Sequence, residues 1–219
     1  MKTVGFIHTA MVLVDIIKRE LSALSLEVNA FHIVDESLLV TLRKVGGVGP
    51  EIVRRLCQHV ISAEETGADI IVVTCSSISP AVDDARRMVD RPVLKIDEPM
   101  AEAAVERGER VGVLATVGTT LEPTSNLVRQ KAVEKGRKVK VSTALCQEAF
   151  KASLRGDMEM YDRVLMEKAI ALAGEVDVLV LAQGSMARLE APLSQKIKIP
   201  VLSSPRLFAE KLKSVLQVI

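Results

Sequence analysis

The chain has 219 residues, of which 48% are hydrophobic and 26% charged, and its 29 Lys and Arg against 28 Asp and Glu give a formal net charge of +1. This length and apolar content suffice to bury a sizeable core, which excludes a disordered chain. The balanced charge lacks the basic excess with which proteins bind phosphate backbones or anionic membranes. One Tyr and no Trp leave little material for base stacking. We therefore expect neither a nucleic-acid nor a membrane partner.

The three cysteines, Cys57, Cys75 and Cys146, are odd in number and far apart. Without a CxxC pair or a Cys/His cluster, they predict no metal site, and a reducing, cytoplasmic location is the simplest interpretation. The first residues run directly into an apolar segment rather than a signal peptide. No apolar stretch approaches the roughly 18–20 residues that cross a bilayer.

Six short apolar runs, each bounded by charged residues, Gly or Pro, punctuate the chain. Segments with helical periodicity, such as Glu51–Glu65 and Met158–Ala173, lie between them. Continuous β-branched runs that alternate with amphipathic helices are typical of parallel strands buried on both faces. We predict an α/β protein with open, mainly parallel sheets flanked by helices. The strands are expected at Val4–Ile7, Ile70–Thr74, Val93–Ile96, Val111–Ala115, Val178–Leu181 and Val201–Leu202.

Some connecting segments have two interpretations. The glycines of Val45–Pro50 form either a flexible cover over a ligand or a simple turn before the helix near Glu51. Pro80 suits the first position of a helix over Ala81–Val89. Asp97, which follows the third strand, either lines a ligand site or begins the next helix.

An internal repeat is the most informative feature of the sequence. Three strand segments recur in the same order at nearly constant spacing, with offsets of 107, 108 and 108 residues. Apolar strands match easily by chance, but a constant register across three of them does not, and we infer a duplicated α/β half. The pairs are VGFIHT (4–9) with VGVLAT (111–116), ADIIVVTCSS (68–77) with VDVLVLAQGS (176–185), and RPVLKIDEP (from 91) with IPVLSSPRL (from 199).

The duplication predicts two domains with related strand-end loops. The first is expected over residues 1–98, completed by a C-terminal helix at 205–219, and the second over 99–204. Ligands of open parallel sheets bind beyond the carboxyl ends of the strands, so we expect the site in a cleft between the two halves. Cys75 and Gln183 then become mirror partners.

The segments VVTCSSISP, VGVLATVGTT and LVLAQGSM together resemble the aspartate/glutamate/hydantoin racemase superfamily, over essentially the whole chain. The resemblance implies a pseudo-symmetric two-domain α/β enzyme that needs no cofactor or metal and that commonly forms homo-oligomers. It further implies a small carboxylate substrate, with one cysteine from each half flanking its α-carbon. Cys75 matches the first of these cysteines.

The second cysteine of the family is missing. Ala182 and Gln183 stand where the racemases typically carry glycine and cysteine, and an amide has no useful basicity toward a carbon-bound proton. Cys57 lies within a helical segment, and Cys146 opens a later segment away from the predicted strand ends. Neither replaces it by position.

Three residues are predicted to be catalytic: Cys75, His8 and Gln183. Cys75 sits at a strand-to-helix junction, where backbone N–H groups are expected to lower the pKa of its thiol and make it a base. His8 departs from the acidic or amide residue frequent at this position in the family; it orients Cys75 or meets a substrate carboxylate, or else merely caps the strand. His32 and His59 have no strand-end context and are expected to be structural or exposed.

Hydroxyl and glycine residues at the same strand ends suit an anion. The alternative is that the threonines begin a helix as N-caps. Arg188 and Arg206 follow strand ends and are expected to be exposed. The residues predicted to bind substrate are Thr9, Ser76, Ser77, Thr116, Gly118, Thr119, Thr120, Gly184 and Ser185.

Three functions fit these residues. The first is a racemase or epimerase acting α to the carboxylate of an amino acid, a hydantoin or a related acid, with Cys75 on one face and His8, Ser185 or a water held by Gln183 assisting on the other. The second is a decarboxylase or other lyase of the same fold, which the missing cysteine favours because protonation of one face needs a single thiol. The third is a carboxylate-binding protein without catalysis.

Overall fold

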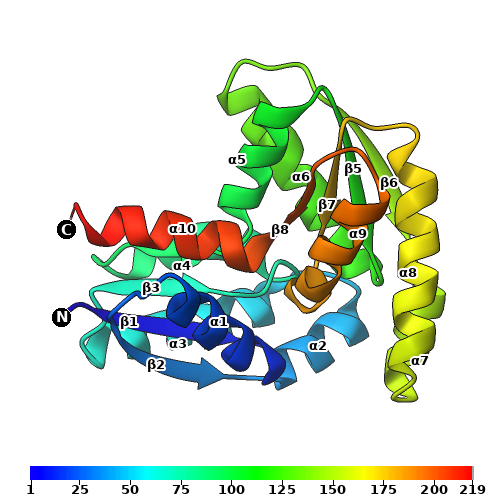
Figure 1. Cartoon of the computed structure of the whole chain (residues 1–219). Coiled ribbons are helices and arrows are strands. Elements are labelled where there is room, and N and C mark those ends of the chain that lie inside the picture. The colour runs from blue at the N-terminus through cyan, green and yellow to red at the C-terminus, as the bar shows by residue number, and fades with distance from the viewer. Residues whose placement is uncertain (219) are drawn as a thin grey trace. The chain divides into compact units, whose positions relative to one another are not determined.

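The computed structural model describes residues 1–218. The chain divides into two compact units, which are described separately: unit 1 comprises Met1–Glu98 and the segment from Pro205 onward, and unit 2 comprises Pro99–Ser204. Each contains one four-stranded parallel sheet flanked by helices (Figure 1). No helix in the described part of the chain is long and apolar enough to span a membrane.

The sheet of unit 1 has the strand order β2-β1-β3-β4, and every pair of neighbours is parallel. Helices cover both of its faces, as the buried side chains of the next paragraph show. The strands are β1 (Thr3–His8), β2 (Asn29–Val34), β3 (Ile70–Val73) and β4 (Val93–Lys95); the helices are α1 (Val12–Ala23), α2 (Ser37–Val45), α3 (Pro50–Glu65), the single turn α4 (Val82–Ala85) between the 3₁₀ turns η1 (Ser79–Ala81) and η2 (Arg86–Met88), and α10 (Ser204–Leu216).

Alternating side chains of the strands build two apolar layers in unit 1, because successive residues of a strand point to opposite faces. On one face Phe6 and Val72 pack with α1 and with Phe208 and Leu212 of α10. On the other face Ile7 packs with residues of α2, α3 and α4. A sheet covered on both faces explains the continuous apolar runs of β1 and β3.

Unit 2 repeats this topology, with the strand order β6-β5-β7-β8 and parallel pairing throughout. Leu114, Leu179 and Leu181 of its strands pack with Leu165 and Leu193 of the helices. The strands are β5 (Arg110–Ala115), β6 (Lys140–Leu145), β7 (Val178–Leu181) and β8 (Val201–Ser203); the helices are α5 (Glu98–Arg107), α6 (Gly118–Glu134), α7 (Gln147–Leu154), α8 (Met158–Ala173), the 3₁₀ turn η3 (Gly184–Leu189) and α9 (Glu190–Lys196).

The predicted α/β class, the six predicted strands and the duplication are confirmed. β1, β3 and β4 correspond to β5, β7 and β8 at offsets of 107, 108 and 108 residues. Glycines occupy matching places in β1 and β5. A methyl group at Gly5 would lie 2.8 Å from the Phe31 ring, and one at Gly112 would lie 3.0 Å from Leu172 and Val176. The same close approach of a neighbouring side chain therefore recurs in both units.

Two details of the sequence interpretation are corrected. β2 and β6 were not predicted, because as edge strands they are half exposed and lack a continuous apolar run. The helix expected over Ala81–Val89 is a chain of short helical turns, with Pro80 in the first of them. Val45–Pro50 forms the turn between α2 and α3, in which Gly46 ends α2 at a φ of 82° that favours glycine.

Candidate active site

The carboxyl ends of the four strands of unit 1 carry the polar side chains of the candidate site. His8 ends β1, Asp35 follows β2, Cys75 lies two residues beyond β3, and Asp97 lies two residues beyond β4. Because the strands are parallel, all four residues belong to one edge of the sheet, which is where ligands of open sheets bind.

Cys75 is half buried and is surrounded by hydrogen-bond donors. Its sulfur accepts from the Thr9 hydroxyl, from the N–H and hydroxyl of Ser77, and from the N–H of Ile78. These donors favour the thiolate, but burial disfavours it more strongly, so the pKa of Cys75 is raised above its ordinary value. The prediction of a lowered pKa is therefore wrong for the free protein, because desolvation outweighs the donors.

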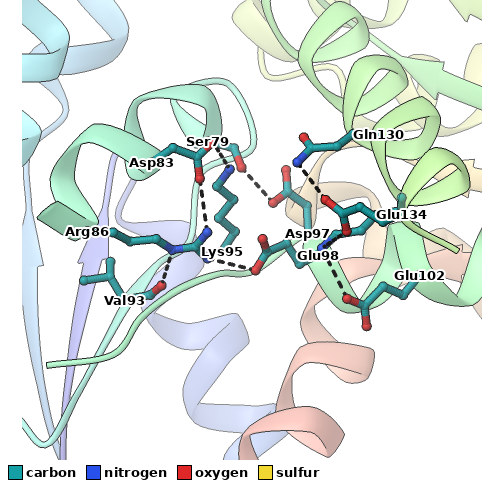
Figure 2. A network of polar contacts seen from close by, with 11 residues as sticks. Ser79, Asp83, Arg86, Val93, Lys95, Asp97, Glu98, Glu102, Gln130 and Glu134 are labelled. Carbon is teal, nitrogen blue, oxygen red and sulfur yellow. Dashed lines mark hydrogen bonds and ion pairs between the residues drawn. The ribbon is translucent and has the colours of Figure 1, made fainter.

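Asp97 supports the turn that holds Cys75. It is fully buried and accepts a hydrogen bond of 2.9 Å from the hydroxyl of Ser79 (Figure 2), and the Ser76 side chain also bonds to it. Its second oxygen, Oδ2, has no partner in the described structure. Burial raises the pKa of Asp97, so its neutral form is favoured. The residue precedes α5 and also stands at the strand end, so the two interpretations of Asp97 coexist.

Ion pairs fix the strand β4 beside this turn. The buried ammonium of Lys95 lies 2.8 Å from Asp83 Oδ2, and Arg86 bonds to Asp83, to the carbonyl of Val93 and to Glu98 (Figure 2). Short helical turns thereby replace a long helix between β3 and β4 without loosening the site.

His8 belongs to a buried histidine pair. It is fully buried, its Nδ1 lies 2.8 Å from the hydroxyl of Thr74, and its Nε2 lies 2.9 Å from His32 Nδ1. Since Thr74 donates its proton to the carbonyl of Ile7, His8 donates through Nδ1 and accepts through Nε2. Burial and the neighbouring His32 lower the pKa of His8 to about 3. This geometry contradicts a direct contact of His8 with Cys75 or substrate, because both ring nitrogens are occupied.

A second polar cluster in unit 1 was missed from the sequence. Asp35 accepts from the guanidinium of Arg55 at 2.5 Å, from His59 Nε2 at 2.7 Å, and from the hydroxyl of Ser37. These partners hold the pKa of Asp35 at about 2 despite partial burial. No sequence signal was available without the strand β2. His32 and His59 are structural, as expected, although both take their places from this missed strand.

In unit 2, Gln183 lies two residues beyond β7, the position that Cys75 holds after β3. Its side-chain oxygen accepts two hydrogen bonds from Thr116, one from the backbone N–H at 2.7 Å and one from the hydroxyl at 2.9 Å. Thr116 lies one residue beyond β5, as Thr9 lies one residue beyond β1. The amide is thus held by its oxygen, and its Nε2 remains as a double donor.

The remaining predicted ligand residues of unit 2 lie at the starts of α6 and η3. Gly118 is exposed, and a methyl group added to it would meet no atom within 4 Å. Thr119 is half buried and Thr120 is buried, and Val117 rather than a threonine is the N-cap of α6. Gly184 and Ser185 begin η3 and are half buried.

Tyr161 and Cys146 lie near Ser185 in unit 2. The Tyr161 hydroxyl shares a hydrogen bond with the Ser185 side chain, and Cys146 is close enough to act on the phenol electrostatically. Cys146 directly follows β6, so the prediction that it lies away from a strand end is wrong, again because β6 was not foreseen. A cavity of about 420 Å³ beside Cys146 is lined by Leu145, Cys146, Gln147, Glu148, Lys151, Val164 and Lys168.

The sequence-predicted residues thus fall into two groups. Unit 1 brings Thr9, Ser76 and Ser77 around Cys75, and unit 2 brings Thr116 onto Gln183. Arg188 and Arg206 are exposed, as expected. Among residues 1–218, no three or more His, Cys, Asp or Glu side chains are grouped so that they could hold a metal ion.

The fold is shared with racemases of known structure. The aspartate racemase of Picrophilus torridus superposes with a TM-score of 0.76 at 16% identity, covering 98% of this chain and 94% of that one. Allantoin racemase from Klebsiella pneumoniae gives a TM-score of 0.73 at 18% identity, covering 100% and 89%.

In sequence, a glutamate racemase of Streptococcus gordonii is 28% identical over 115 residues, which is 51% of this chain and 43% of that protein. The chain spans about half the length of the curated relatives it matches. The model of the Asp/Glu/hydantoin racemases matches residues 31–212. That match covers most of the sequence, including both duplicated halves, and the chain therefore belongs to the Asp/Glu/hydantoin racemase family.

Proposed function

We propose that the protein is a cofactor-independent isomerase that removes and returns a proton α to the carboxylate of a small acid, such as an amino acid or a hydantoin, with Cys75 as the proton carrier. The observation that carries the proposal is the set of donors around the Cys75 sulfur. Two backbone N–H groups and the hydroxyls of Thr9 and Ser77 point to one atom. Such a preorganised set stabilises a thiolate once substrate binding changes its surroundings.

The raised pKa of Cys75 defines its resting state as the thiol. A thiol delivers a proton to a carbanion or enediolate, and the thiolate left behind, held by the same donors, takes a proton from the next substrate. The reaction therefore needs no metal to activate the residue. Ser76 and Ser77 are proposed to bind the substrate carboxylate beside the sulfur, as are Thr9 and the backbone of this turn.

His8 has no proposed contact with substrate. Its pair with His32 and its bond to Thr74, the residue before Cys75, make it a positioning residue for the turn. Gln183 is proposed to bind substrate through Nε2, because its oxygen is engaged with Thr116 and an amide does not accept a carbon-bound proton.

One observation favours a second candidate, a single-thiol lyase such as a decarboxylase. The amide of Gln183 stands where the family's second cysteine is expected, and its fixed oxygen leaves only donors there. A decarboxylase protonates one face of an enediolate, so Cys75 alone suffices. A racemase needs a proton on the other face, which Ser185 or a water held by Gln183 would have to deliver.

The test is incubation in D₂O with a panel of amino acids, hydantoins and α-substituted malonates. An isomerase places deuterium at the α-carbon and scrambles its configuration, whereas a decarboxylase releases CO₂ and leaves deuterium on one face. Cys75→Ala is expected to abolish either reaction, and Cys57→Ala is the matched control that retains it. Full activity of Cys75→Ala would overturn the proposal.

A further inference from the structure

Unit 2 contains a side-chain chain that the proposed mechanism does not use. Tyr161 of α8 is buried, with 5% of its surface exposed, and its hydroxyl reaches the half-buried Ser185 at the end of β7. The guanidinium carbon of Arg188 lies 5.3 Å from the centroid of the Tyr161 ring. Arg188 is itself held by an ion pair with Asp162, the residue after Tyr161. The ring is therefore fixed from both its edge and its face.

From this geometry we propose that Tyr161 is a positioning residue which, through Ser185, completes a donor site in unit 2 for a carboxylate or enediolate oxygen. The ligand class rests on the proposed function. Ser185 and Gln183 are separated by one residue at the end of β7, and each has its oxygen engaged by a partner in the same unit. What each offers a ligand is then an O–H or an N–H.

The direction of the Tyr161–Ser185 bond follows from burial. A buried phenol holds its proton, and burial raises the pKa of Tyr161. The phenol therefore donates to the Ser185 oxygen, and the serine hydroxyl turns its own proton outward. A donor whose oxygen already accepts a hydrogen bond is polarised and donates more strongly. Together with the two N–H bonds of Gln183, the pair attracts an anion and offers no base.

An all-donor site has a chemical consequence for the reaction. Hydrogen-bond donors fixed before the substrate arrives stabilise charge that develops on an oxygen, and they do not remove a proton from carbon. Ser185 is then a ligand for the intermediate's oxygen rather than the second proton carrier. The proton chemistry is left to the thiol of Cys75.

The composition of the chain supplies the test, because Tyr161 is the one Tyr and there is no Trp. Tyrosine emission therefore reports on this residue alone. Malonate and L-aspartate serve as anion probes, against chloride at equal ionic strength. We expect a saturable change in emission with either acid and none with chloride. Ser185→Ala is expected to lose the change and to weaken binding in calorimetry about tenfold, as for a lost hydrogen bond to a charged group.

Two further variants separate positioning from general packing. Tyr161→Phe keeps the ring but removes the hydroxyl, and it is expected to weaken malonate binding about fivefold while leaving unfolding by urea nearly unchanged. Ser153→Ala, whose hydroxyl bonds only to the carbonyl of Phe150 in the described structure, is the matched control and should bind as the wild type does. In a spectroscopic titration of the phenol, Ser185→Ala should raise the pKa of Tyr161, because the bond to Ser185 lowers it.

The outcomes also separate this inference from the proposed function. If deuterium exchange depends on Cys75 but neither acid changes the emission, or if Ser185→Ala binds as tightly as the wild type, the donor site is refuted and the enzyme assignment stands. If both acids bind with the expected Ser185 dependence while no acid in the panel exchanges its proton, the proposed function fails and the donor site stands.

Discussion

Thr116 engages the side-chain oxygen of Gln183 with both of its donors, at 2.7 and 2.9 Å. Thr9, its counterpart in the duplicated fold, donates its hydroxyl to the sulfur of Cys75. The two units thus keep the threonine and differ in the group that it holds. A thiol, which exchanges protons, stands in one unit, and an amide, which does not, stands in the other.

The first prediction follows from this exchange. Gln183→Cys should place a thiol where the Thr116 donors can stabilise its anion, and α-proton exchange with scrambled configuration should rise at least about tenfold, the lower range of what one general acid or base contributes. Chiral chromatography of the acids after incubation in D₂O measures it. Gln183→Glu keeps the two acceptor bonds without a thiol and should show no gain; equal rates for the two variants would contradict the prediction.

Thr9→Val should make Cys75 less reactive. The Thr9 hydroxyl lowers the thiol pKa against the larger effect of burial, so its loss moves that pKa further upward. At pH 7.5 alkylation of Cys75 by iodoacetamide should slow about three- to tenfold, since one pKa unit is a tenfold change in thiolate. Peptide mass spectrometry distinguishes Cys75 from the other two cysteines. Thr66→Val, which removes an exposed hydroxyl bonded to the Ser62 carbonyl, should leave the rate unchanged.

The buried histidine pair should make stability depend on pH. In the unfolded chain His8 titrates at its ordinary pKa of 6.5, and in the folded protein at about 3. The unfolded state therefore binds the proton first, and stability is full above pH 6.5 and lost as the pH falls toward 3. His8→Asn should flatten the dependence of the unfolding free energy between pH 4.5 and 6.5 by up to about 1.4 kcal/mol per pH unit.

Urea denaturation followed by circular dichroism measures this slope. Asp35 does not interfere in the chosen range, because its pKa of about 2 and its ordinary value of 3.8 both lie below it. Parallel curves for the wild type and His8→Asn would show that the pair does not control acid stability.

The glycines of unit 2 should separate stability from ligand approach. Gly112→Ala places a methyl group 3.0 Å from Leu172 and Val176, and overpacking of this kind costs about 1–3 kcal/mol of unfolding free energy. Gly118→Ala meets no atom and should be neutral or stabilise by up to about 1 kcal/mol. If the backbone at Gly118 contacts substrate, its KM should nevertheless rise. A normal KM together with normal stability would remove Gly118 from the site.

Strands with strong apolar patterns were predictable from the sequence, and edge strands were not. β1 and β3 are buried on both faces and read as continuous apolar runs, whereas β2 includes exposed and half-buried positions occupied by Asn29 and His32. The repeat located the sheets because it compares segments with each other rather than with a template. It did not reach β2 and β6, which are offset by 111 residues and share little sequence.

The missed edge strands account for the missed site residues. Without β2, nothing in the sequence places Asp35 at the same sheet edge as Cys75, and without β6 Cys146 has no strand to follow. The pKa of Cys75 could not be predicted from its turn alone, because its sign depends on burial by residues distant in sequence. Position along a strand is local, but the balance of desolvation against hydrogen bonding is not.

Unit 1 is discontinuous in the chain, and this affects the order in which the protein can assemble. Phe208 and Leu212 of α10 complete the apolar layer over Val4 and Phe6, so residues 1–98 alone leave that layer uncovered. Residues 99–204 form a contiguous unit with its own apolar core and can fold as soon as they are synthesised. A nascent chain is thus expected to mature its amide-bearing lobe first, and the lobe that carries the reactive sulfur would stay immature until the ribosome has released α10.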